Sequence, residues 1–212
     1  MSLNEKLAAI RGKKKYPAEK LAILHRANDE LAASGILDQV IKVGDRLPEF
    51  SLKNADDITV HSNNLLAEGP LVLTVFRGSW WPFCVVELYA LQEIVDPLKA
   101  AGAKLIAISP EMAKHTHTMW KKKSLEFDIL SDPGNIYADL LGLRFKLPDY
   151  VKSIYLEFGI DLTVYNGDDS WTLPMPGRFV IDRNGIIRAV NVNPDYKNRP
   201  EPEKTVADIS AL

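Results

Sequence analysis

Residues 71–98 constrain the fold of this chain more than any other stretch. Residues 71–76 form an apolar run whose β-branched and aromatic side chains are typical of a buried strand. The pattern then breaks, and Pro82 suits the first turn of a helix, where its missing N–H is not needed. Apolar side chains follow at the three- and four-residue spacing of one helical face, namely Cys84, Leu88, Leu91, Val95 and Leu98. We therefore predict a buried strand and then a helix that runs from Pro82 to about residue 101.

Cys84 is the single cysteine of the 212 residues, and the predicted helix places it in the first turn. The unpaired N–H groups and the positive dipole end at a helix start stabilise an anion, and they lower the pKa of a thiol placed there. We therefore expect Cys84 to be reactive and its pKa to be low. The alternative is an inert core residue, because free cysteines are among the most buried side chains. A lone cysteine also excludes a disulfide within the chain.

Charge and hydropathy exclude several classes of protein. Basic residues number 26 and acidic residues 28, so the net charge of −2 provides no basic field that would recruit nucleic acid or an anionic membrane. No stretch approaches the ~18 apolar residues that a membrane-spanning helix requires, and the N-terminus lacks the apolar core of a signal peptide. We expect a cytoplasmic protein with neither nucleic acid nor a membrane as a partner.

The remaining pattern indicates an α/β domain with a helical extension. Residues 1–40 form the N-terminal extension and are expected to be helical, with a helix start at Pro17. In residues 41–212, strands alternate with helices and a late hairpin follows, which is typical of a mixed sheet. The pair Asn184-Gly185 connects the hairpin strands and favours a two-residue type I′ turn. Strands are expected near residues 50–52, 58–60, 71–76, 104–109, 127–130, 179–182 and 186–190, and helices near 110–123, 135–141 and 149–158.

No motif of the sequence calls for a metal, a flavin or a nucleotide. His115 and His117 lie two residues apart on a predicted helix, so their side chains point to different faces and are not expected to share a metal ion. The sequence contains neither a glycine-rich phosphate loop nor the Gly-x-Ser-x-Gly pattern of a nucleophilic serine. We expect no cofactor.

Four segments together resemble the peroxiredoxin-like proteins of the alkyl hydroperoxide reductase/thiol-specific antioxidant family. These segments are residues 43–52, 76–88, 130–134 and 179–182, and the resemblance spans about residues 41–212. It implies a thioredoxin-like fold, in which helices flank a mixed sheet. One bacterial subgroup has a similar helical N-terminal extension and similar closing segments at residues 192–196 and 199–202.

The resemblance also implies roles for the residues around Cys84. The subgroup usually reads Trp-Cys-Pro-Tyr-Cys where this chain reads Trp80-Trp81-Pro82-Phe83-Cys84. Cys84 thus matches the peroxidatic cysteine, and Trp81 replaces the first cysteine of the pair. Typical members carry Thr or Ser at the position of Trp81, and that hydroxyl helps to hold the peroxide. The indole N–H of Trp81, by contrast, can only donate a hydrogen bond.

Two arginines, one glutamate and one proline complete the expected site. Arg77 follows the predicted strand and Arg178 precedes another, so both guanidinium groups are candidates to donate to a thiolate and a peroxide oxygen. Glu87 lies one turn after the cysteine, where it could orient Arg77 or another base. Pro176 resembles the cis-proline that faces the active-site cysteine in thioredoxin-fold proteins, with Pro174 as the second choice. The alternatives are exposed or ion-paired arginines, a surface carboxylate and an ordinary trans proline.

The aromatic residues beside the cysteine are candidates for the substrate pocket. Trp80, Trp81 and Phe83, next to Pro82, are expected to form an apolar mouth that suits an organic hydroperoxide or a protein partner. Alternatively, these rings only pack at a strand–helix junction.

Three functions remain open. The first is a one-cysteine thiol peroxidase, in which Cys84 attacks hydrogen peroxide or a small organic hydroperoxide and becomes a sulfenic acid. An external thiol, from a thioredoxin-like protein or a small molecule, or Cys84 of another subunit would then reduce the sulfenic acid, and the enzyme is expected to be a homodimer. The second is a thioredoxin-fold binding protein without redox activity, which Trp81 favours. The third is a thiol transferase that forms mixed disulfides.

Overall fold

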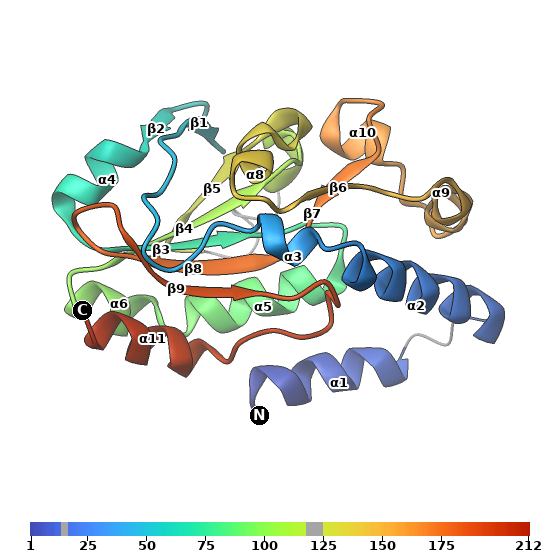
Figure 1. The fold of residues 1–212 in the computed structure, drawn as a ribbon, viewed down its shortest axis with the longest axis horizontal. Coiled ribbons are helices and arrows are strands. Elements are labelled where there is room, and N and C mark those ends of the chain that lie inside the picture. Colours follow the sequence, from blue (N-terminus) through green and yellow to red (C-terminus); the bar gives the residue numbers. More distant parts are fainter. Residues whose placement is uncertain (14–16, 118–124) are drawn as a thin grey trace.

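The computed structural model describes residues 1–13, 17–117 and 125–212. Within these residues, the strands form a seven-stranded mixed sheet in the order β2-β1-β5-β4-β3-β8-β9 and a two-stranded sheet, β6-β7 (Figure 1). The predicted mixed sheet is confirmed, whereas the sequence did not predict β6 and β7. The strands are β1 (Ser51–Asn54), β2 (Thr59–His61), β3 (Leu71–Val75), β4 (Lys104–Ser109), β5 (Asp128–Ser131), β6 (Arg144–Lys146), β7 (Thr172–Pro174), β8 (Gly177–Ile181) and β9 (Ile187–Val192).

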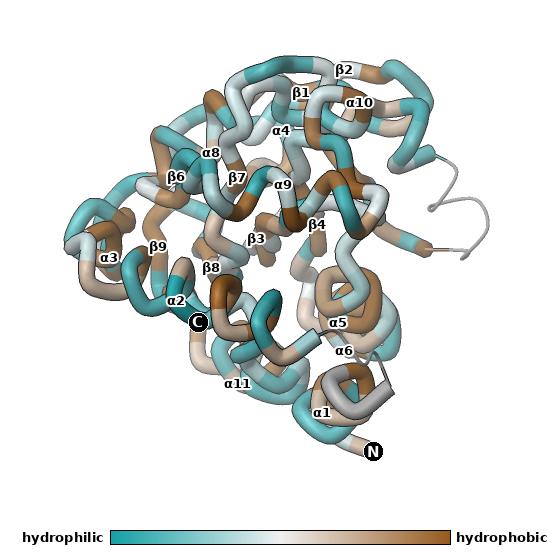
Figure 2. Tube along the Cα trace, turned by 90° about the vertical axis from the view of Figure 1, so that its right-hand side faces the viewer, coloured by the Kyte–Doolittle hydropathy of each residue, from teal (hydrophilic) through white to brown (hydrophobic). Residues whose placement is uncertain are grey.

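Helices cover both faces of the seven-stranded sheet. The cores on the two faces are separate: α5, α6 and α11 pack on one face, and α3, α4 and α8 pack on the other (Figure 1). Hydrophobic residues gather on α5, which lies against the sheet (Figure 2). The helices are α1 (Leu3–Lys13), α2 (Ala18–Ala33), α3 (Ile36–Gln39), α4 (Ser62–Glu68), α5 (Pro82–Gln92), α6 (Val95–Ala100), α8 (Ile136–Leu140), α9 (Asp149–Glu157), α10 (Leu162–Asn166) and α11 (Pro202–Ser210).

Strand β3 lies in the middle of the sheet and leads to the cysteine. It pairs in parallel with β4 and antiparallel with β8, and all of its residues are buried. Its side chains alternate between the two faces, so Val72 joins the core under α5 whereas Leu71 and Leu73 join the opposite core. The carboxyl end of β3 therefore lies at the centre of the sheet, and the loop before α5 begins there.

The first N-terminal helix packs against the rest of the molecule. Leu3 and Leu7 of α1 are buried against Ala90 of α5. The backbone N–H groups of Leu3 and Asn4 donate to the carboxylate of Glu201 at 2.8 and 3.0 Å. A residue close to the C-terminus thus satisfies two of the donors that a helix start leaves unpaired.

The predicted helix from Pro82 to about residue 101 is wrong in its length. α5 ends at Gln92, and α6 begins at Val95. Pro97 accounts for the break, because it lacks an N–H group and its ring collides with the carbonyl group four residues earlier. The apolar face nevertheless continues across the break, since Val95 and Leu98 join the same core as the apolar residues of α5.

The predicted hairpin between β8 and β9 is present, but the predicted type I′ turn is wrong. Gly185 has a left-handed φ of 78°, whereas Asn184 does not have a positive φ. The Gly185 N–H donates to the Asp182 carbonyl at 2.9 Å, which makes residues 182–185 a type I turn closed by a left-handed glycine. The Asp182 carboxylate accepts from the N–H groups of Asn184 and Ile186, and these bonds favour the observed turn.

The predicted cis-proline is also wrong. No peptide bond in the described ranges is cis, so the bonds before Pro174 and Pro176 are both trans. Pro174 is the last residue of β7 and pairs with Arg144, and the Met175 N–H donates to the Leu143 carbonyl at 2.8 Å. These pairings keep the chain extended from β7 into β8, and a trans bond maintains the full spacing of successive Cα atoms.

Part of one predicted helix cannot be compared with the structure. Residues 113–117 are helical, and residues 118–123 of the helix predicted near 110–123 lie outside the described residues. Of the helices that the structure describes, none combines the length and the apolar character needed to cross a membrane.

Candidate active site

Cys84 lies in the first turn of α5, which the chain enters through a tight loop. Trp81 is the N-cap residue, and Pro82 follows in the first turn, where a missing N–H leaves nothing unpaired. Gly78 has a φ of 151°, and a Cβ atom at this position would meet the Trp80 indole nitrogen at 2.2 Å. Only glycine therefore allows Trp80 to fold over the loop. The Cys84 side chain at the end of this loop is fully buried.

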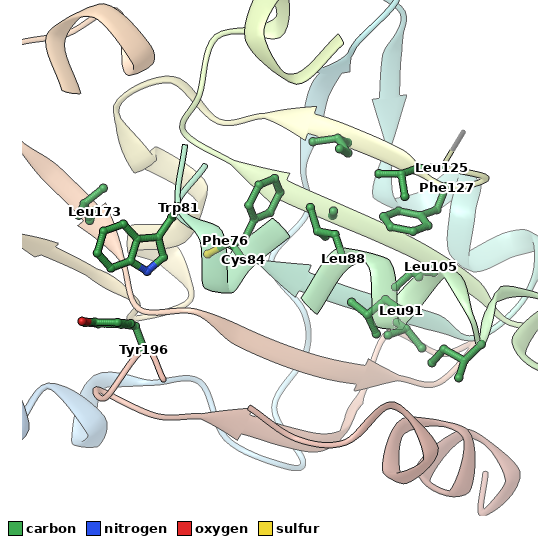
Figure 3. Packing of buried hydrophobic residues seen from close by; sticks show 14 of the residues in the cluster. Phe76, Trp81, Cys84, Leu88, Leu91, Leu105, Leu125, Phe127, Leu173 and Tyr196 are labelled. Carbon is green, nitrogen blue, oxygen red and sulfur yellow. The ribbon is translucent and has the colours of Figure 1, made fainter. Parts of the chain in front are cut away.

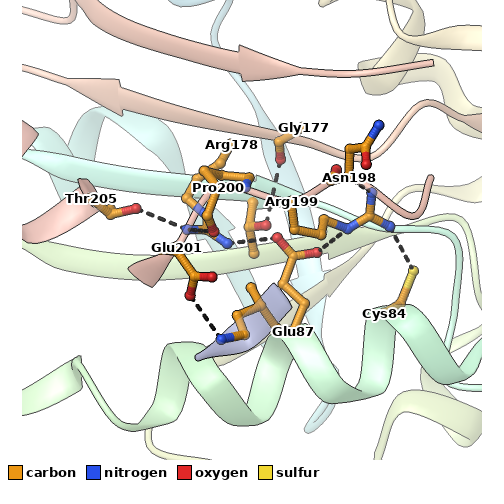
Figure 4. Close-up of polar contacts among 11 residues, drawn as sticks. Cys84, Glu87, Gly177, Arg178, Asn198, Arg199, Pro200, Glu201 and Thr205 are labelled. Carbon is orange, nitrogen blue, oxygen red and sulfur yellow. Dashed lines mark hydrogen bonds and ion pairs between the residues drawn. The ribbon is translucent and has the colours of Figure 1, made fainter. Parts of the chain in front are cut away.

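A chain of buried charges leads from Cys84 into the protein (Figure 4). The Nη2 atom of Arg199 lies 3.9 Å from the Cys84 Sγ atom, and the Nε atom of Arg199 lies 2.7 Å from Glu87 Oε2. The Nη2 atom of Arg178 donates to Glu87 Oε1 at 2.6 Å. Two guanidinium groups and one carboxylate sum to a charge of +1, which a thiolate on Cys84 would neutralise. Because these side chains are buried, their charges interact more strongly than they would on the surface.

Arg178 holds the carboxylate rather than the thiol. Its Nη1 atom donates to the Pro200 carbonyl at 3.2 Å and to the Thr205 hydroxyl at 2.9 Å. Its contacts fix Glu87, and Glu87 in turn fixes Arg199. The predicted residue Arg178 is therefore part of the site, but the contact with sulfur that the sequence suggested for it is made by Arg199.

Arg77 approaches the cysteine from the loop after β3. Its backbone N–H interacts with the Cys84 sulfur and favours the thiolate. Its guanidinium group lies over the Tyr196 ring, 4.9 Å from the ring centroid, and over the Phe145 ring at 5.4 Å. The Arg77 Nε atom is buried and has no hydrogen-bond partner within the described residues. The predicted proximity of Arg77 to Cys84 is observed, with the backbone making the direct contact.

Burial has the largest effect on the pKa of the Cys84 thiol. It raises the pKa of Cys84, and the nearby charges of Arg199 and Arg77, together with the Arg77 N–H, oppose that rise. The negative charge of Glu87 adds to the rise. The prediction of a low pKa is therefore wrong for this closed pocket, because desolvation outweighs the helix start and the arginines.

Aromatic rings close the pocket over Cys84. Trp81 is 6% exposed and stacks on Tyr155, with ring centroids 5.8 Å apart and an interplanar angle of 19°. Tyr196 meets the Trp81 ring edge-on at 5.0 Å. Figure 3 shows Trp81, Tyr196 and Cys84 within one apolar cluster. The predicted apolar mouth is therefore a packed lid in this structure.

The loop before α5 is anchored from the neighbouring strand. The backbone N–H and the hydroxyl of Ser79 donate to the two carboxylate oxygens of Glu111 at 2.8 and 2.7 Å. Glu111 lies just beyond the end of β4 and is fully buried. Burial raises the pKa of its carboxyl group, and the bonds from Ser79 oppose that rise. These bonds hold the loop that carries Trp80 and Trp81.

Two cavities flank the site, and each is lined by some of the remaining predicted residues. One cavity, of about 280 Å³, is lined by Pro176 and by the charged side chains of Glu87, Arg178 and Arg199. An apolar cavity of about 360 Å³ lies on the side of the aromatic rings, and Trp81, Pro82 and Phe83 line it. Trp80 packs between Trp81, Tyr155 and Tyr165. The structure thus places the other eight predicted residues around Cys84, on two different sides.

Sequence reasoning missed three residues that contact this site. Arg199 was part of the closing segment that carried the resemblance, but no role was assigned to it. Tyr155, on α9, interacts with the Arg77 side chain, and burial raises the pKa of its hydroxyl. Tyr196 supports both Arg77 and Trp81. The sequence signal for Arg199 is its place in that closing segment.

The arrangement suits nucleophilic chemistry at sulfur. Guanidinium and N–H donors surround a single thiol. The same donors can also bind the leaving-group oxygen of a reagent that the thiol attacks. Across residues 1–13, 17–117 and 125–212, no three His, Cys, Asp or Glu side chains gather where they could hold a metal ion.

Comparisons with known proteins relate this chain to one family. The model of the AhpC/TSA family matches residues 43–190. "Peroxiredoxin Q, chloroplastic" from Triticum aestivum is 26% identical over 192 residues, which cover 91% of this chain and 76% of the relative. The protein of the same name from Sedum lineare is 26% identical over 182 residues, which cover 86% of this chain and 82% of the relative.

Solved structures agree with the fold. Peroxidoxin BcpB from Mycobacterium tuberculosis superposes with a TM-score of 0.64 at 19% identity, covering 81% of this chain and 98% of the other. A cysteine-to-serine mutant of peroxiredoxin 6 from Arenicola marina gives 0.65 at 17% identity, with coverages of 81% and 73%. A yeast mitochondrial 1-Cys peroxiredoxin, described with its thiol resolving mechanism via glutathione/thioredoxin systems, gives 0.62 at 19% identity, with coverages of 82% and 76%.

Proposed function

Because the chain belongs to the AhpC/TSA family, we propose that it is a thiol-dependent peroxidase of the one-cysteine type. Its substrates are hydrogen peroxide or small organic hydroperoxides. The observation that carries the proposal is the 3.9 Å contact between the Arg199 guanidinium and the Cys84 sulfur, inside a buried cluster of net positive charge. An inert core cysteine has no need of two buried arginines.

Oxidation of Cys84 proceeds in one displacement step. The Cys84 thiolate attacks the terminal peroxide oxygen and the O–O bond breaks. The sulfur keeps that oxygen as a sulfenic acid, and the leaving oxygen takes up a proton to give water or an alcohol. Arg199 stabilises the thiolate, and the donors of Arg77 and Arg199 stabilise the charge that develops on the leaving oxygen.

An external thiol returns Cys84 to its reduced form. The chain has a single cysteine, so a second thiol in the same chain cannot resolve the sulfenic acid. A small thiol or a thioredoxin-like protein attacks the sulfenic sulfur, forms a mixed disulfide and releases water, and a further thiol frees Cys84. The description of the yeast 1-Cys relative, which names glutathione/thioredoxin systems, supports this class of reductant. The proposal includes a cytoplasmic homodimer, and light scattering tests the dimer.

Turnover is tested by peroxide consumption in the presence of dithiothreitol. Wild-type protein is expected to consume hydrogen peroxide or cumene hydroperoxide in proportion to its concentration, and the Cys84→Ser variant is expected to match the rate without protein. Equal rates for the wild type and Cys84→Ser with both peroxides would refute the proposal.

The second candidate is a binding protein without redox activity. The complete burial of Cys84 beneath Trp81, together with its raised pKa, favours this function. It predicts that the thiol remains reduced in the presence of peroxide and still reacts with an alkylating reagent after unfolding. The same peroxide experiment therefore separates the two candidates.

A further inference from the structure

A cavity of about 280 Å³, the arginine cavity, lies beside Arg178 and Arg199. Lys204 is the third cation of its lining, and Glu87 is the only acidic residue there. Three asparagines add amide groups, namely Asn191, Asn193 and Asn198. The lining therefore combines an excess of positive charge with hydrogen-bond donors, and this combination suits an anion.

Arg199 retains hydrogen-bond donors for a ligand. It lines the arginine cavity and is only 7% exposed. Its Nη1 atom donates to the Asn198 carbonyl at 3.3 Å, and its Nη2 atom lies 3.9 Å from the Cys84 sulfur. Because each Nη atom carries two protons, one proton on each has no acceptor among the residues that the structure describes. An oxyanion in the cavity would supply acceptors for these buried donors.

The charge of the buried cluster also calls for an anion. Arg178 and Arg199 bind one carboxylate between them, that of Glu87, so the cluster carries a charge of +1 while Cys84 is a neutral thiol (Figure 4). Burial favours the neutral thiol, because it raises the pKa of Cys84. A buried charge without a counter-ion is unfavourable, and an anion in the arginine cavity would balance it.

The register of the sheet places a further donor next to the cluster. Arg178 of β8 lies directly opposite Asn191 of β9, so their side chains emerge on the same face of the sheet. Both residues line the arginine cavity. The amide of Asn191 is therefore available to a ligand that the guanidinium groups attract.

We propose that the arginine cavity binds a small oxyanion, a carboxylate or a phosphate, and that this anion competes with the Cys84 thiolate for Arg199. A planar guanidinium group binds both kinds of oxyanion through parallel N–H groups. Arg199 contacts the sulfur and also lines the cavity, so one positive charge serves both anions. Occupation of the cavity therefore disfavours the thiolate, and the thiolate disfavours occupation to the same extent. The oxyanion is an inhibitor of reactions at Cys84, a regulation that goes beyond the peroxidase function.

Binding is measured by titration calorimetry with inorganic phosphate and with acetate, at constant pH and ionic strength in sodium chloride. Asn191→Asp places a carboxylate beside Arg178 and is expected to weaken binding about tenfold or more. The matched control Asn64→Asp makes the same change at an exposed position of α4, on the opposite face of the sheet, and is expected to retain binding.

The two titrations identify the oxyanion, because the preferred probe is either the tetrahedral or the planar one. Absence of binding with both probes, or equal affinity in the two variants, overturns the site. Thermal unfolding verifies that Asn191→Asp folds. Lys204→Gln, at an exposed position of the lining, provides a second variant, and we expect it to weaken binding about threefold.

The competition is measured as the rate at which iodoacetamide, an uncharged reagent, alkylates Cys84. The oxyanion that binds is expected to slow alkylation of the wild type and of Asn64→Asp about fivefold or more, relative to chloride at the same pH and ionic strength. Asn191→Asp is expected to alkylate at the same rate in both salts. Equal rates for the wild type in the two salts overturn the competition, and slowing that persists in Asn191→Asp means that the anion acts elsewhere. Neither experiment uses a peroxide, so both results stand whether or not the protein is a peroxidase.

Discussion

The guanidinium group of Arg199 lies 3.9 Å from the Cys84 sulfur through Nη2 and 2.7 Å from Glu87 through Nε. One arginine therefore joins the thiol to a buried carboxylate, and that carboxylate also binds Arg178 at 2.6 Å. The position of the charge beside sulfur depends on this whole chain of contacts. Each member makes a different contribution, which substitutions can separate.

Replacing Arg199 by methionine is expected to slow the reaction of Cys84 with iodoacetamide. The variant removes the positive charge that opposes the raised pKa of the thiol, so the pKa rises further. A rise of one unit lowers the thiolate fraction about tenfold at pH 8. The measurement is the alkylation rate as a function of pH, with Arg188→Met as a control because Arg188 is half exposed and pairs with Asp182. An unchanged pH profile would exclude Arg199 as a stabiliser of the thiolate.

Replacing Glu87 by glutamine is expected to destabilise the fold strongly. The change leaves two buried guanidinium groups without their carboxylate, and breaking a buried ion pair in this way costs about 3–5 kcal/mol. Urea unfolding measures the loss. The matched control is Asp208→Asn, which removes the partner of Lys204 at the surface and should cost no more than about 1 kcal/mol. Similar losses for the two variants would show that the buried cluster is not a major source of stability.

Replacing Trp81 by threonine is expected to expose the thiol. The change removes the ring that stacks on Tyr155 and should cost about 3–5 kcal/mol of stability, as in other large-to-small core substitutions. Alkylation of Cys84 by iodoacetamide under native conditions should become faster, because the pocket opens. Trp81→Phe keeps an aromatic ring in place and should remain slow. Equal rates for the two variants would mean that Trp81 does not control access.

The raised pKa of Cys84 makes stability depend on pH in a defined direction. The neutral thiol is favoured in the folded state, so its contribution is complete below the unfolded pKa of about 8.5. It is lost as the pH rises through the folded pKa, because the unfolded chain releases its proton first. The free energy of unfolding of the wild type should therefore fall relative to that of Cys84→Ser above about pH 8.5. A constant difference between pH 7 and pH 10 would mean that the pKa is not raised.

The sequence predicts the structural features that depend on residues close together in the chain. β4 (Lys104–Ser109) has the predicted bounds, because an unbroken apolar run identifies a buried strand. The three-residue spacing of Cys84 and Glu87 places both on one side of α5, which the helical period predicts. The basic partners of Glu87 are Arg178 and Arg199, whereas the sequence had suggested Arg77 first. The break near Pro97 could also have been predicted from the sequence, because proline is incompatible with an unbroken helix at that position.

The sequence does not predict contacts between residues that are far apart in the chain. Arg199 is 115 residues from Cys84, and their contact depends on the path of the chain between β9 and α11. Tyr155 reaches the site from α9 for the same reason. The pKa of Cys84 depends on how completely the rings exclude water, and no local pattern contains that information. The predicted place of Cys84 in the first turn of a helix is therefore confirmed, but the helix start predicted the wrong direction for its pKa.

The most direct test of the account is intact-mass spectrometry after one equivalent of hydrogen peroxide, with and without dimedone. Dimedone traps a sulfenic acid, so the account predicts a single dimedone adduct on the wild-type protein within minutes and none on Cys84→Ser. A parallel reaction with cumene hydroperoxide covers the case in which the apolar substrate is strongly preferred. If neither peroxide gives an adduct while the thiol can still be alkylated after unfolding, Cys84 is not a peroxidatic cysteine.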